Sequence, residues 1–487
     1  MVIKKIIPFI KKIKNSPPPV KAAFWFTLCS VINKGIQLIT VPIFTRLLTT
    51  TEYGEYSIFV SWQSIILIIA TLNIHCNVIN NAFVKFPHKK DEYISSMQGL
   101  TTTISLVLIA VFTIFNKPIS DFIGLPPFLI YILLIEIMLT PGFELWAAKE
   151  RFDYKYKKVV AATLFLLIMN PLLGLVFVHF ANEKGYARIL SVLVVQLVLY
   201  GLFYILNLKK NRSFFSKDKW KYALSLTIPL VPHYLSQTLL SQMDRIMISD
   251  MISTDKAGIY SVAYSSAMLL QIVGKSIQSA FTPWIYKKIK NEKTEDIKGV
   301  VNCLVILVGA LNFIIICLAP EVIMVLGGAK YSEAIYVIPP VVCSSLLIFL
   351  YSMFCTIEFY FEKSKAMMVV SVFGAAVNYI TNYFFIPIFG YYAAGFTTLF
   401  CYIIFVILHS FVMKSALKKN GHTKNVYDMK FIWSFVVLFI AISIGLMFIY
   451  ENFLIRYLII FIFVVAIVLT KNKWIKYISV VKEKDSV

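Results

Sequence analysis

Long apolar stretches separated by short polar turns follow one another along almost the whole chain. A helix needs about 20 consecutive apolar residues to cross the hydrocarbon core of a membrane. Fourteen stretches of roughly that length are present, and several contain Pro or Gly, which membrane helices tolerate. We therefore predict an all-α polytopic membrane protein with about 14 transmembrane helices. Their approximate spans are 22–44, 57–81, 97–116, 126–148, 159–180, 186–207, 222–250, 257–284, 299–319, 334–357, 364–387, 391–413, 430–450 and 453–470.

The composition agrees with this pattern. Of the 487 residues, 59% are hydrophobic and only 15% are charged. Such an excess of apolar residues excludes a soluble enzyme, a DNA-binding protein and a disulfide scaffold. The seven cysteines all fall inside apolar stretches, which is typical of buried free thiols, and no Cys/His spacing resembles a zinc motif. We expect neither a metal site nor a cofactor.

The basic residues fall on alternate loops. Thirty-seven of the 47 Lys and Arg residues lie in the N-terminal tail and every second loop, and seven lie on the opposite side. The remaining three, Lys34, Arg245 and Lys275, lie inside predicted spans. Because cytoplasmic loops carry the excess of Lys and Arg, both termini are predicted to be cytoplasmic. This placement accounts for the net charge of +22 without nucleic acid as a partner. Residues 1–21 are predicted to be a basic segment on the inner membrane surface.

Two segments repeat at an offset of 204 residues. Leu47 to Thr50 is followed by a Gly, a Tyr and a Ser at positions 54, 56 and 57, and Met251 to Thr254 is followed by the same residues at 258, 260 and 261. Six helices separate the copies, so the repeat is parallel, as in transporters that alternate access between two halves. The predicted organisation is a cytoplasmic segment 1–21, an N-lobe 22–208, a basic linker 209–221, a C-lobe 222–413 and a C-terminal part 414–487 with two further helices.

Four stretches together carry a resemblance to a known family. They are SVINKGIQLITVPIFTRLLTTTEYGEYSIF (30–59), ERFDYKYKKV (150–159), MDRIMISDMISTDKAGIYSVAY (243–264) and NYITNYFFIPIFGYYAAGFTTLFCYIIF (378–405). They resemble the polysaccharide transporter, or O-antigen flippase, family of the multidrug/oligosaccharidyl-lipid/polysaccharide exporter (MOP) superfamily.

The resemblance implies two six-helix lobes and two extra helices. It also implies flipping of undecaprenyl-diphosphate-linked oligosaccharide units across the bacterial inner membrane, for O-antigen of lipopolysaccharide, capsule or exopolysaccharide. The implied partners are membrane lipids, a polysaccharide polymerase and a chain-length regulator. We expect the transporter to act as a monomer.

The three cations inside the spans are the predicted substrate-binding residues. A charged side chain at membrane depth is costly and should face protein or a water-filled cavity. Lys34, Arg245 and Lys275 would form a cationic cavity that attracts a lipid diphosphate. The alternatives are structural: Lys34 paired with a carboxylate such as Glu136, and Arg245 with Asp244 in an ion pair that locks helices together. Asp244 and Glu136 are in turn candidates for ion coupling or for structural pairing.

Polar side chains at helical spacing are predicted to line the same cavity. They are Gln37 on the first helix, Asn73 and Asn77 on the second, His233 and Gln237 on the seventh and Gln271 on the eighth. The asparagines are candidates for contact with sugar hydroxyls, and interhelical hydrogen bonds are the alternative.

Enzyme motifs are missing from the sequence. It has no G-x-x-x-x-G-K-[ST] motif for ATP, no D-x-D pair and no sizeable extramembrane loop. Transport would then draw on an ion gradient or the membrane potential. The leading hypothesis is a lipid-linked oligosaccharide flippase. A multidrug or cation antiporter of the same superfamily is the alternative, and a membrane polysaccharide polymerase comes after it.

Overall fold

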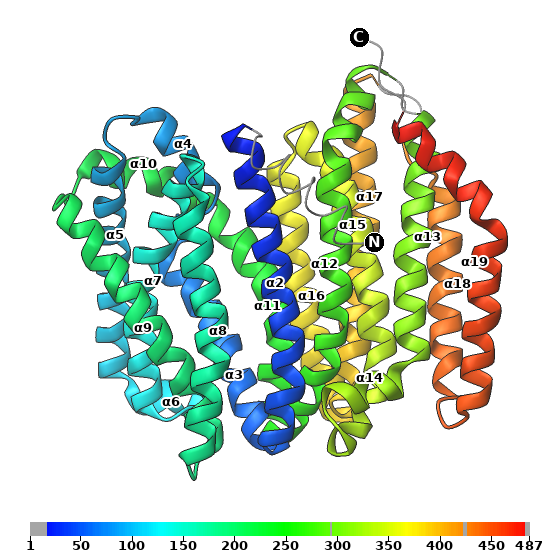
Figure 1. Ribbon diagram of the computed structural model, residues 1–487, viewed down its shortest axis with the longest axis horizontal. Coiled ribbons are helices and arrows are strands. Elements are labelled where there is room, and N and C mark those ends of the chain that lie inside the picture. Colours follow the sequence, from blue (N-terminus) through cyan, green and yellow to red (C-terminus); the bar gives the residue numbers. More distant parts are fainter. Residues whose placement is uncertain (1–16, 293–294, 422–425, 483–487) are drawn as a thin grey trace, which may run out of the picture. The chain divides into compact units, whose positions relative to one another are not determined.

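A computed structural model describes residues 17–292, 295–421 and 426–482, and these residues form helices and no β-strand (Figure 1). The side chains of Lys34 and Asn77 lie outside the described ones, as does most of the predicted surface segment 1–21. The described chain divides into two compact units, residues 1–238 and 239–487.

The described residues of unit 1 form eleven helical elements or parts of them. They are α2 (Pro18–Leu47), α3 (Thr50–Thr71), α4 (Asn77–Lys85), α5 (Lys90–Ile114), α6 (Asn116–Ile123), α7 (Pro127–Phe152), α8 (Tyr156–Phe180), α9 (Lys184–Lys210), α10 (Lys217–Thr227), the 3-10 turn η1 (Ile228–Leu230) and the first part of α11 (Val231–Met251).

Unit 2 holds the rest of α11 and nine further elements. These are α12 (Thr254–Lys290), α13 (Glu295–Cys317), α14 (Ala319–Leu326), the 3-10 turn η2 (Ala329–Tyr336), α15 (Ile338–Tyr360), α16 (Ser364–Phe389), α17 (Tyr392–Lys419), α18 (Met429–Met447) and α19 (Phe453–Lys482).

Twelve helices of the described chain are long and apolar enough to cross a membrane, which confirms the prediction of an all-α polytopic membrane protein. The other two predicted spans are also helical. One is α11, whose many polar residues lower its mean hydropathy, and the other is α19, whose apolar part is Phe453–Leu469.

The helix boundaries reproduce the sequence repeat. Leu47 ends α2 and Met251 ends α11, while Thr50 begins α3 and Thr254 begins α12, so both boundaries are 204 residues apart. A capping box forms at the start of α3. The backbone N–H of Glu52 donates to the Thr49 hydroxyl oxygen, and the backbone N–H of Thr49 donates to the Glu52 carboxylate. After η2, which has no helical counterpart in unit 1, the offset becomes 208: α8 and α16, and α9 and α17, begin that far apart.

The two units also pack equivalent helices against each other. In unit 1, α7 contacts α9, α5 and α3, and α8 contacts α9. In unit 2, α15 contacts α17, α13 and α12, and α16 contacts α17. Gly142 lets α7 and α9 approach closely, because a Cβ there would lie 2.6 Å from the backbone nitrogen of Tyr204. The last two helices pack on unit 2, with α18 against α13 and α15, and α19 against α13.

The second predicted span, 57–81, is corrected by the structure. Helix α3 begins earlier, at Thr50, and ends at Thr71, where Leu72 and Asn73 adopt left-handed φ angles of 48° and 53°. A short turn then leads to α4. Asn73 therefore lies in the break rather than on a continuous helical stripe with Asn77. Irregular backbone at membrane depth is tolerated only where protein or a water-filled cavity surrounds it.

The seventh predicted span, 222–250, is also interrupted. Pro229 lies in η1 and Pro232 in the first turn of α11. Because proline lacks the backbone N–H that a helix interior needs, the chain passes from α10 through η1 into α11. The interruption separates the lysine-rich α10 from α11.

The predicted linker 209–221 is not a free connection. Its second half belongs to α10, which packs against α5 and α4 of unit 1. Lys219 forms an ion pair with Glu92, and the indole N–H of Trp220 donates to the Ser96 carbonyl at 2.9 Å. The division between the units therefore falls inside α11, at residue 238, and not in the basic stretch.

Ion pairs join the helix ends on the same side of unit 1. Lys90 Nζ lies 2.6 Å from Asp153 Oδ1, and Lys149 Nζ lies 2.7 Å from Asp91 Oδ1. Burial alone would raise the pKa of Asp153, but the hydrogen bond from Lys90 outweighs it and holds that pKa below its usual value. These pairs fasten α5 to the end of α7.

Candidate functional site

A buried carboxylate network forms the polar centre of unit 2. Asp244, on α11, is almost fully buried and accepts three hydrogen bonds from three other helices. Tyr260 Oη on α12 donates to Oδ2 at 2.6 Å, Thr398 Oγ1 on α17 donates to Oδ2 at 2.8 Å, and Asn382 Nδ2 on α16 donates to Oδ1 at 2.7 Å. The donors are uncharged, and they connect four helices through one side chain.

The network extends by one more layer. Thr397 Oγ1 donates to the amide oxygen of Asn382, and Asn378 Nδ2 donates to Thr398 Oγ1 at 3.1 Å. All these side chains are buried. A buried polar group is costly unless its partners are in place, so this network specifies how α11, α12, α16 and α17 pack.

Arg245 lies beside the network but has different partners. Its guanidinium stacks on the ring of Tyr264 at 4.3 Å from the centroid. Its Nη1 donates to the carbonyl of Ser241 and, at 3.2 Å, to Gln242 Oε1. Gln271 is hydrogen-bonded to the Tyr264 hydroxyl. The structure thus brings Asp244, Arg245 and Gln271 into one region, with Arg245 buried rather than open to a cavity.

Lys275 differs from Arg245 in its exposure. It lies on α12 one turn beyond Gln271, its side chain is exposed, and it has no hydrogen-bond or ion-pair partner among the described residues. A cation held at that place is free to meet an anion that arrives from outside the unit.

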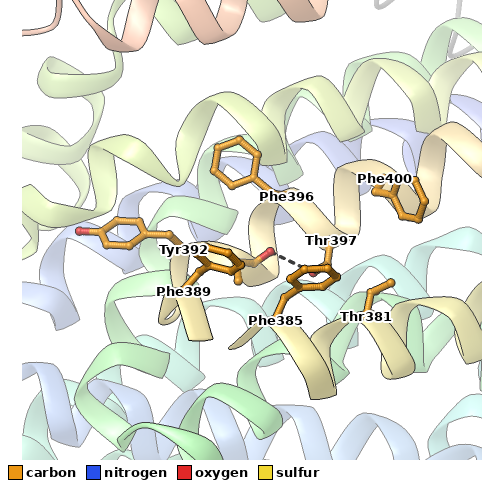
Figure 2. Close-up of a pocket in the computed structure, with 8 residues that line it drawn as sticks. Thr381, Phe385, Phe389, Tyr392, Phe396, Thr397 and Phe400 are labelled. Atoms are coloured by element: carbon orange, nitrogen blue, oxygen red, sulfur yellow. Dashed lines mark hydrogen bonds between the residues drawn. The ribbon is translucent and has the colours of Figure 1, made fainter. Parts of the chain in front are cut away.

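An aromatic pocket of about 500 Å³ adjoins the carboxylate network in unit 2 (Figure 2). Thr397 lies in its wall, so one hydroxyl belongs both to the pocket and to the network around Asp244. The remaining lining comes from α16 and α17: Thr381, Phe385, Phe389, Tyr392, Ala393, Phe396 and Phe400. Such a pocket suits an apolar chain or the face of a ring.

Glu136 is the buried carboxylate of unit 1. It lies on α7 and accepts hydrogen bonds from Gln63 Nε2 at 3.1 Å and from Thr140 Oγ1 at 2.9 Å. Gln63 also donates to Gln196 Oε1 at 3.3 Å, which links α3, α7 and α9. These partners are uncharged. The predicted alternative of a pair with Lys34 concerns a side chain outside the described ones.

A second cavity, of about 230 Å³, lies in unit 1 beside α2. Ser30 and Asn33 of α2, Arg151 at the end of α7 and Thr163 of α8 provide its polar lining. The Oδ1 atom of Asn33 is buried and has no described hydrogen-bond partner. Phe26, Cys29, Val159 and Val160 complete the wall. A cation beside an unpaired acceptor suits a ligand that carries both an anionic group and hydroxyls.

The remaining predicted residues are more scattered. Gln37 is exposed on α2, and His233 and Gln237 are half-buried on the part of α11 that belongs to unit 1. The amide oxygen of Asn73 accepts a hydrogen bond from Cys76 Sγ at 3.2 Å within the break after α3. Lys34 and Asn77 have no described side chain. The structure therefore groups Asp244, Arg245 and Gln271 and leaves the grouping of the others as a prediction.

Sequence reasoning missed Arg188. This residue is not among the cations that the sequence singles out, but it is buried on α9 with its guanidinium 4.0 Å from the ring centroid of Phe44 and 4.9 Å from that of Tyr56. Its Nη1 donates to the Asn170 carbonyl at 3.1 Å. Its position four residues after Lys184, near the start of a span, gave no signal that separates it from a loop charge.

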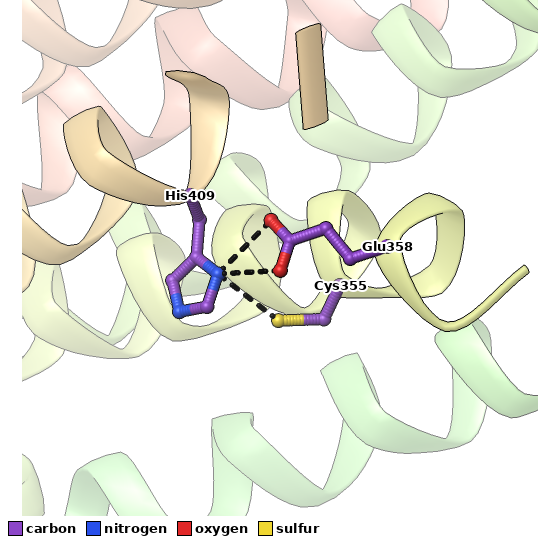
Figure 3. A group of neighbouring side chains, drawn as sticks. All are labelled: Cys355, Glu358 and His409. Carbon is purple, nitrogen blue, oxygen red and sulfur yellow. Dashed lines mark hydrogen bonds and ion pairs between the residues drawn. The ribbon is translucent and has the colours of Figure 1, made fainter. Parts of the chain in front are cut away.

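A second group that the sequence did not indicate joins α15 to α17 in unit 2. Cys355, Glu358 and His409 are all buried and lie together (Figure 3). Glu358 and Cys355 precede His409 by 51 and 54 residues, so the packing of the two helices brings the three side chains together.

Comparison with known proteins agrees with this architecture. The polysaccharide biosynthesis protein family matches residues 20–289, which is more than half of the chain. A Haemophilus influenzae protein described as "Lsg locus putative protein 1" is 22% identical over 365 residues, which cover 71% of this chain and 86% of that protein.

Two solved structures share the fold. A structure described as "Lipid II flippase MurJ, inward closed conformation" has a TM-score of 0.63 at 14% identity, covering 89% of this chain and 99% of that one. An inward-facing multidrug resistance MATE transporter of the MOP superfamily has a TM-score of 0.62 at 14% identity, covering 80% and 96%. With twelve described helices that are long and apolar enough to cross a membrane, the chain is a multi-pass membrane protein, and it shares the fold of these two structures. It belongs to the polysaccharide biosynthesis protein family, the polysaccharide transporter and flippase family that the sequence resembles.

Proposed function

We propose that this chain flips undecaprenyl-diphosphate-linked oligosaccharide units from the cytoplasmic to the outer face of the bacterial inner membrane by alternating access. The observation that carries the proposal is the combination of a polysaccharide biosynthesis family with a transporter fold. When a polysaccharide unit is assembled on a membrane lipid at the cytoplasmic face, it must be moved to the outer face. This translocation step makes and breaks no covalent bond. A transporter in this family fits that step.

The charges support an anionic cargo. Lys275 is exposed at membrane depth, and Arg151 lines the polar cavity of unit 1 beside the unpaired Asn33 oxygen. We assign Lys275, together with Lys34 and Arg245, to attraction of the lipid diphosphate, and the Arg151 cavity to its first contact on the cytoplasmic side. A cargo with two negative charges moving outward is favoured by the membrane potential, by about 2.3 kcal/mol per charge per 100 mV.

The buried carboxylates have separate roles in this proposal. Asp244 holds α11, α12, α16 and α17 in place through its three donors, and Arg245, the next residue on α11, stacks on Tyr264. Glu136 has only neutral partners in unit 1 and is the candidate for ion coupling. A polymerase and a chain-length regulator that act on the delivered unit complete the proposed partners.

The test uses a strain in which this gene alone is deleted. We expect lipid-diphosphate-linked repeat units to accumulate on the cytoplasmic face of the inner membrane and surface polysaccharide to be lost. Wild-type protein restores both, whereas Lys275→Ala, which removes the exposed cation, restores less than about a tenth of the transport rate. Lys275→Arg keeps the charge and should restore most of it.

The matched control is Lys287→Ala. It removes an exposed lysine from the last turn of the same helix, α12, and should transport as wild type does. Repeat units that reach the outer face unpolymerised in the deletion strain would point to a polymerase. Unchanged pools would contradict the proposal and direct attention to drug or cation antiport.

A further inference from the structure

Three donor atoms of different chemistry meet in the interior of unit 2. Cys355 and Glu358 lie one turn apart on α15, and His409 faces them from α17 (Figure 3). His409 Nδ1 lies 3.0 Å from each carboxylate oxygen of Glu358 and 3.5 Å from Cys355 Sγ. All three side chains are buried, and the donor atoms lie within 4.8 Å of one another.

These separations match those of ligands around one ion. With Zn–N near 2.0–2.1 Å and Zn–S near 2.3 Å, tetrahedral angles place the nitrogen and sulfur about 3.5 Å apart. A carboxylate that binds through both oxygens lowers the N–Zn–O angles at the metal to about 90°, which gives N···O separations of about 3.0 Å. Both values agree with the observed distances, although the carboxylate and the imidazole also lie within reach of a direct ion pair.

The surroundings of His409 also favour a bound ion. Nε2 of His409 is buried and has no described partner. Nδ1 is the atom that faces both Cys355 Sγ and the Glu358 carboxylate. A divalent cation held between these atoms by one thiolate, one carboxylate and one imidazole makes the buried group neutral overall.

The repeat shows that the fold itself does not require these ligands. Tyr154 and Glu362, 208 residues apart, follow α7 and α15 with left-handed φ angles of 58° and 55°, which fixes the register at this point. In that register Glu358 corresponds to Glu150. The positions of Cys355 and His409 are held in unit 1 by Ala147 and Gly201. The equivalent helix pair of unit 1, α7 and α9, therefore packs without a thiol or an imidazole at these positions.

We propose that Cys355, Glu358 and His409 form a binding site for a divalent transition metal ion of the zinc class, which fastens α15 to α17. A mixed sulfur, nitrogen and oxygen donor set suits Zn²⁺ and Co²⁺ and is unsuited to Mg²⁺ or Ca²⁺. The site differs from the expectation of no metal that the cysteine spacing gave, because its ligands come from two helices. It is independent of the proposed function.

The test measures metal in the full-length protein purified in detergent. After incubation with Zn²⁺ and removal of free ion, elemental analysis should find about one zinc per wild-type chain. Cys355→Ser and His409→Gln should each lower the affinity for zinc at least about tenfold. Cys343→Ser is the matched control, because it replaces another buried thiol on the same helix and should leave the zinc content unchanged.

Co²⁺ reports on the sulfur directly. The wild type and Cys343→Ser should show a thiolate-to-cobalt charge-transfer band that Cys355→Ser lacks, and a chelator should lower the thermal midpoint of the wild type. Folded wild-type protein that binds neither ion would overturn the proposal and leave a Glu358–His409 pair. Equal zinc content in wild type and Cys355→Ser would also overturn it. Either result would leave the proposed flippase function unaffected, because metal content is measured without a transport assay.

Discussion

Tyr56 and Tyr260 occupy the same place in the two units, 204 residues apart, but they face opposite charges. Tyr56 on α3 lies against the guanidinium of Arg188, whereas Tyr260 on α12 donates a hydrogen bond to the carboxyl of Asp244. The helix boundaries and the packed helix pairs around them are equivalent. The repeat therefore supplies a common scaffold, and each unit has its own buried polar chemistry.

The helices that carry these tyrosines also differ further along. Helix α3 ends at Thr71, whose counterpart is Lys275, and α12 continues to Lys290. In α12 the amide of Gln278 donates to the Ser352 carbonyl at 2.8 Å on α15, which helps to hold the continuous helix. In α3 the chain turns through Leu72 and Asn73. The exposed Lys275 of unit 2 and the end of α3 in unit 1 therefore lie at the same position of the repeat.

Removing the two tyrosine hydroxyls gives the largest expected contrast. Tyr260→Phe removes a donor to a buried carboxyl and should lower the free energy of unfolding by about 1.5–3 kcal/mol. Tyr56→Phe keeps the ring against Arg188 and should change it by less than about 0.5 kcal/mol. Thermal and denaturant unfolding of the purified protein in detergent would measure both. Equal losses of unfolding free energy in the two variants would show that the two hydroxyls contribute equally to stability.

The sequence predicted the scaffold better than the polar contacts. Apolar length alone located the helices, and the repeated turn residues at 47–50 and 251–254 located their shared boundaries. The break after α3 was missed because Leu72 and Asn73 are compatible with a helix, and only tertiary packing makes the left-handed turn favourable. The sequence singles out Asp244 and Arg245, but the partners of Asp244 include Asn382 and Thr398, which lie about 140 and 150 residues away, where spacing carries no information.

Glycine substitution tests the break itself. Leu72 holds a left-handed φ, but its side chain also packs against the apolar cluster around Phe83, so glycine is compared with alanine, which loses nearly the same packing. Leu72→Gly should be about 1 kcal/mol more stable than Leu72→Ala, because glycine adopts this φ without strain. Its counterpart Ser276 lies inside the continuous α12, where Ser276→Gly should be about 1 kcal/mol less stable than Ser276→Ala. Opposite signs of the Gly–Ala difference in unfolding experiments would confirm that the two helices differ in backbone. A less stable glycine variant at both positions would contradict the break.

The smallest expected difference lies at the short helices α6 and α14, which correspond in the repeat. Among the described residues, only α14 is held by a C-terminal helix. Arg456 of α19 forms a bidentate ion pair with Glu321, in which Nη1 lies 2.7 Å from Oε2 and Nη2 lies 2.8 Å from Oε1. Burial alone would raise the pKa of Glu321, but the hydrogen bonds from Arg456 outweigh it and hold that pKa below its usual value. The pair therefore stabilises the folded state above the ordinary glutamate pKa, near 4.3, and this contribution is lost as the pH falls through the lowered value.

Hydrogen exchange at 319–326 and 116–123 measures this contrast. Because Glu321 is about one-third exposed, Glu321→Gln should cost less than about 1 kcal/mol of local stability at pH 7, and exchange should rise in α14 only. The difference between variant and wild type should shrink below about pH 4, where the wild-type carboxyl takes up its proton. An equal rise in α6, or a difference that persists in acid, would show that the ion pair does not hold α14. The C-terminal helices would then stabilise unit 2 through their packing against α13 and α15.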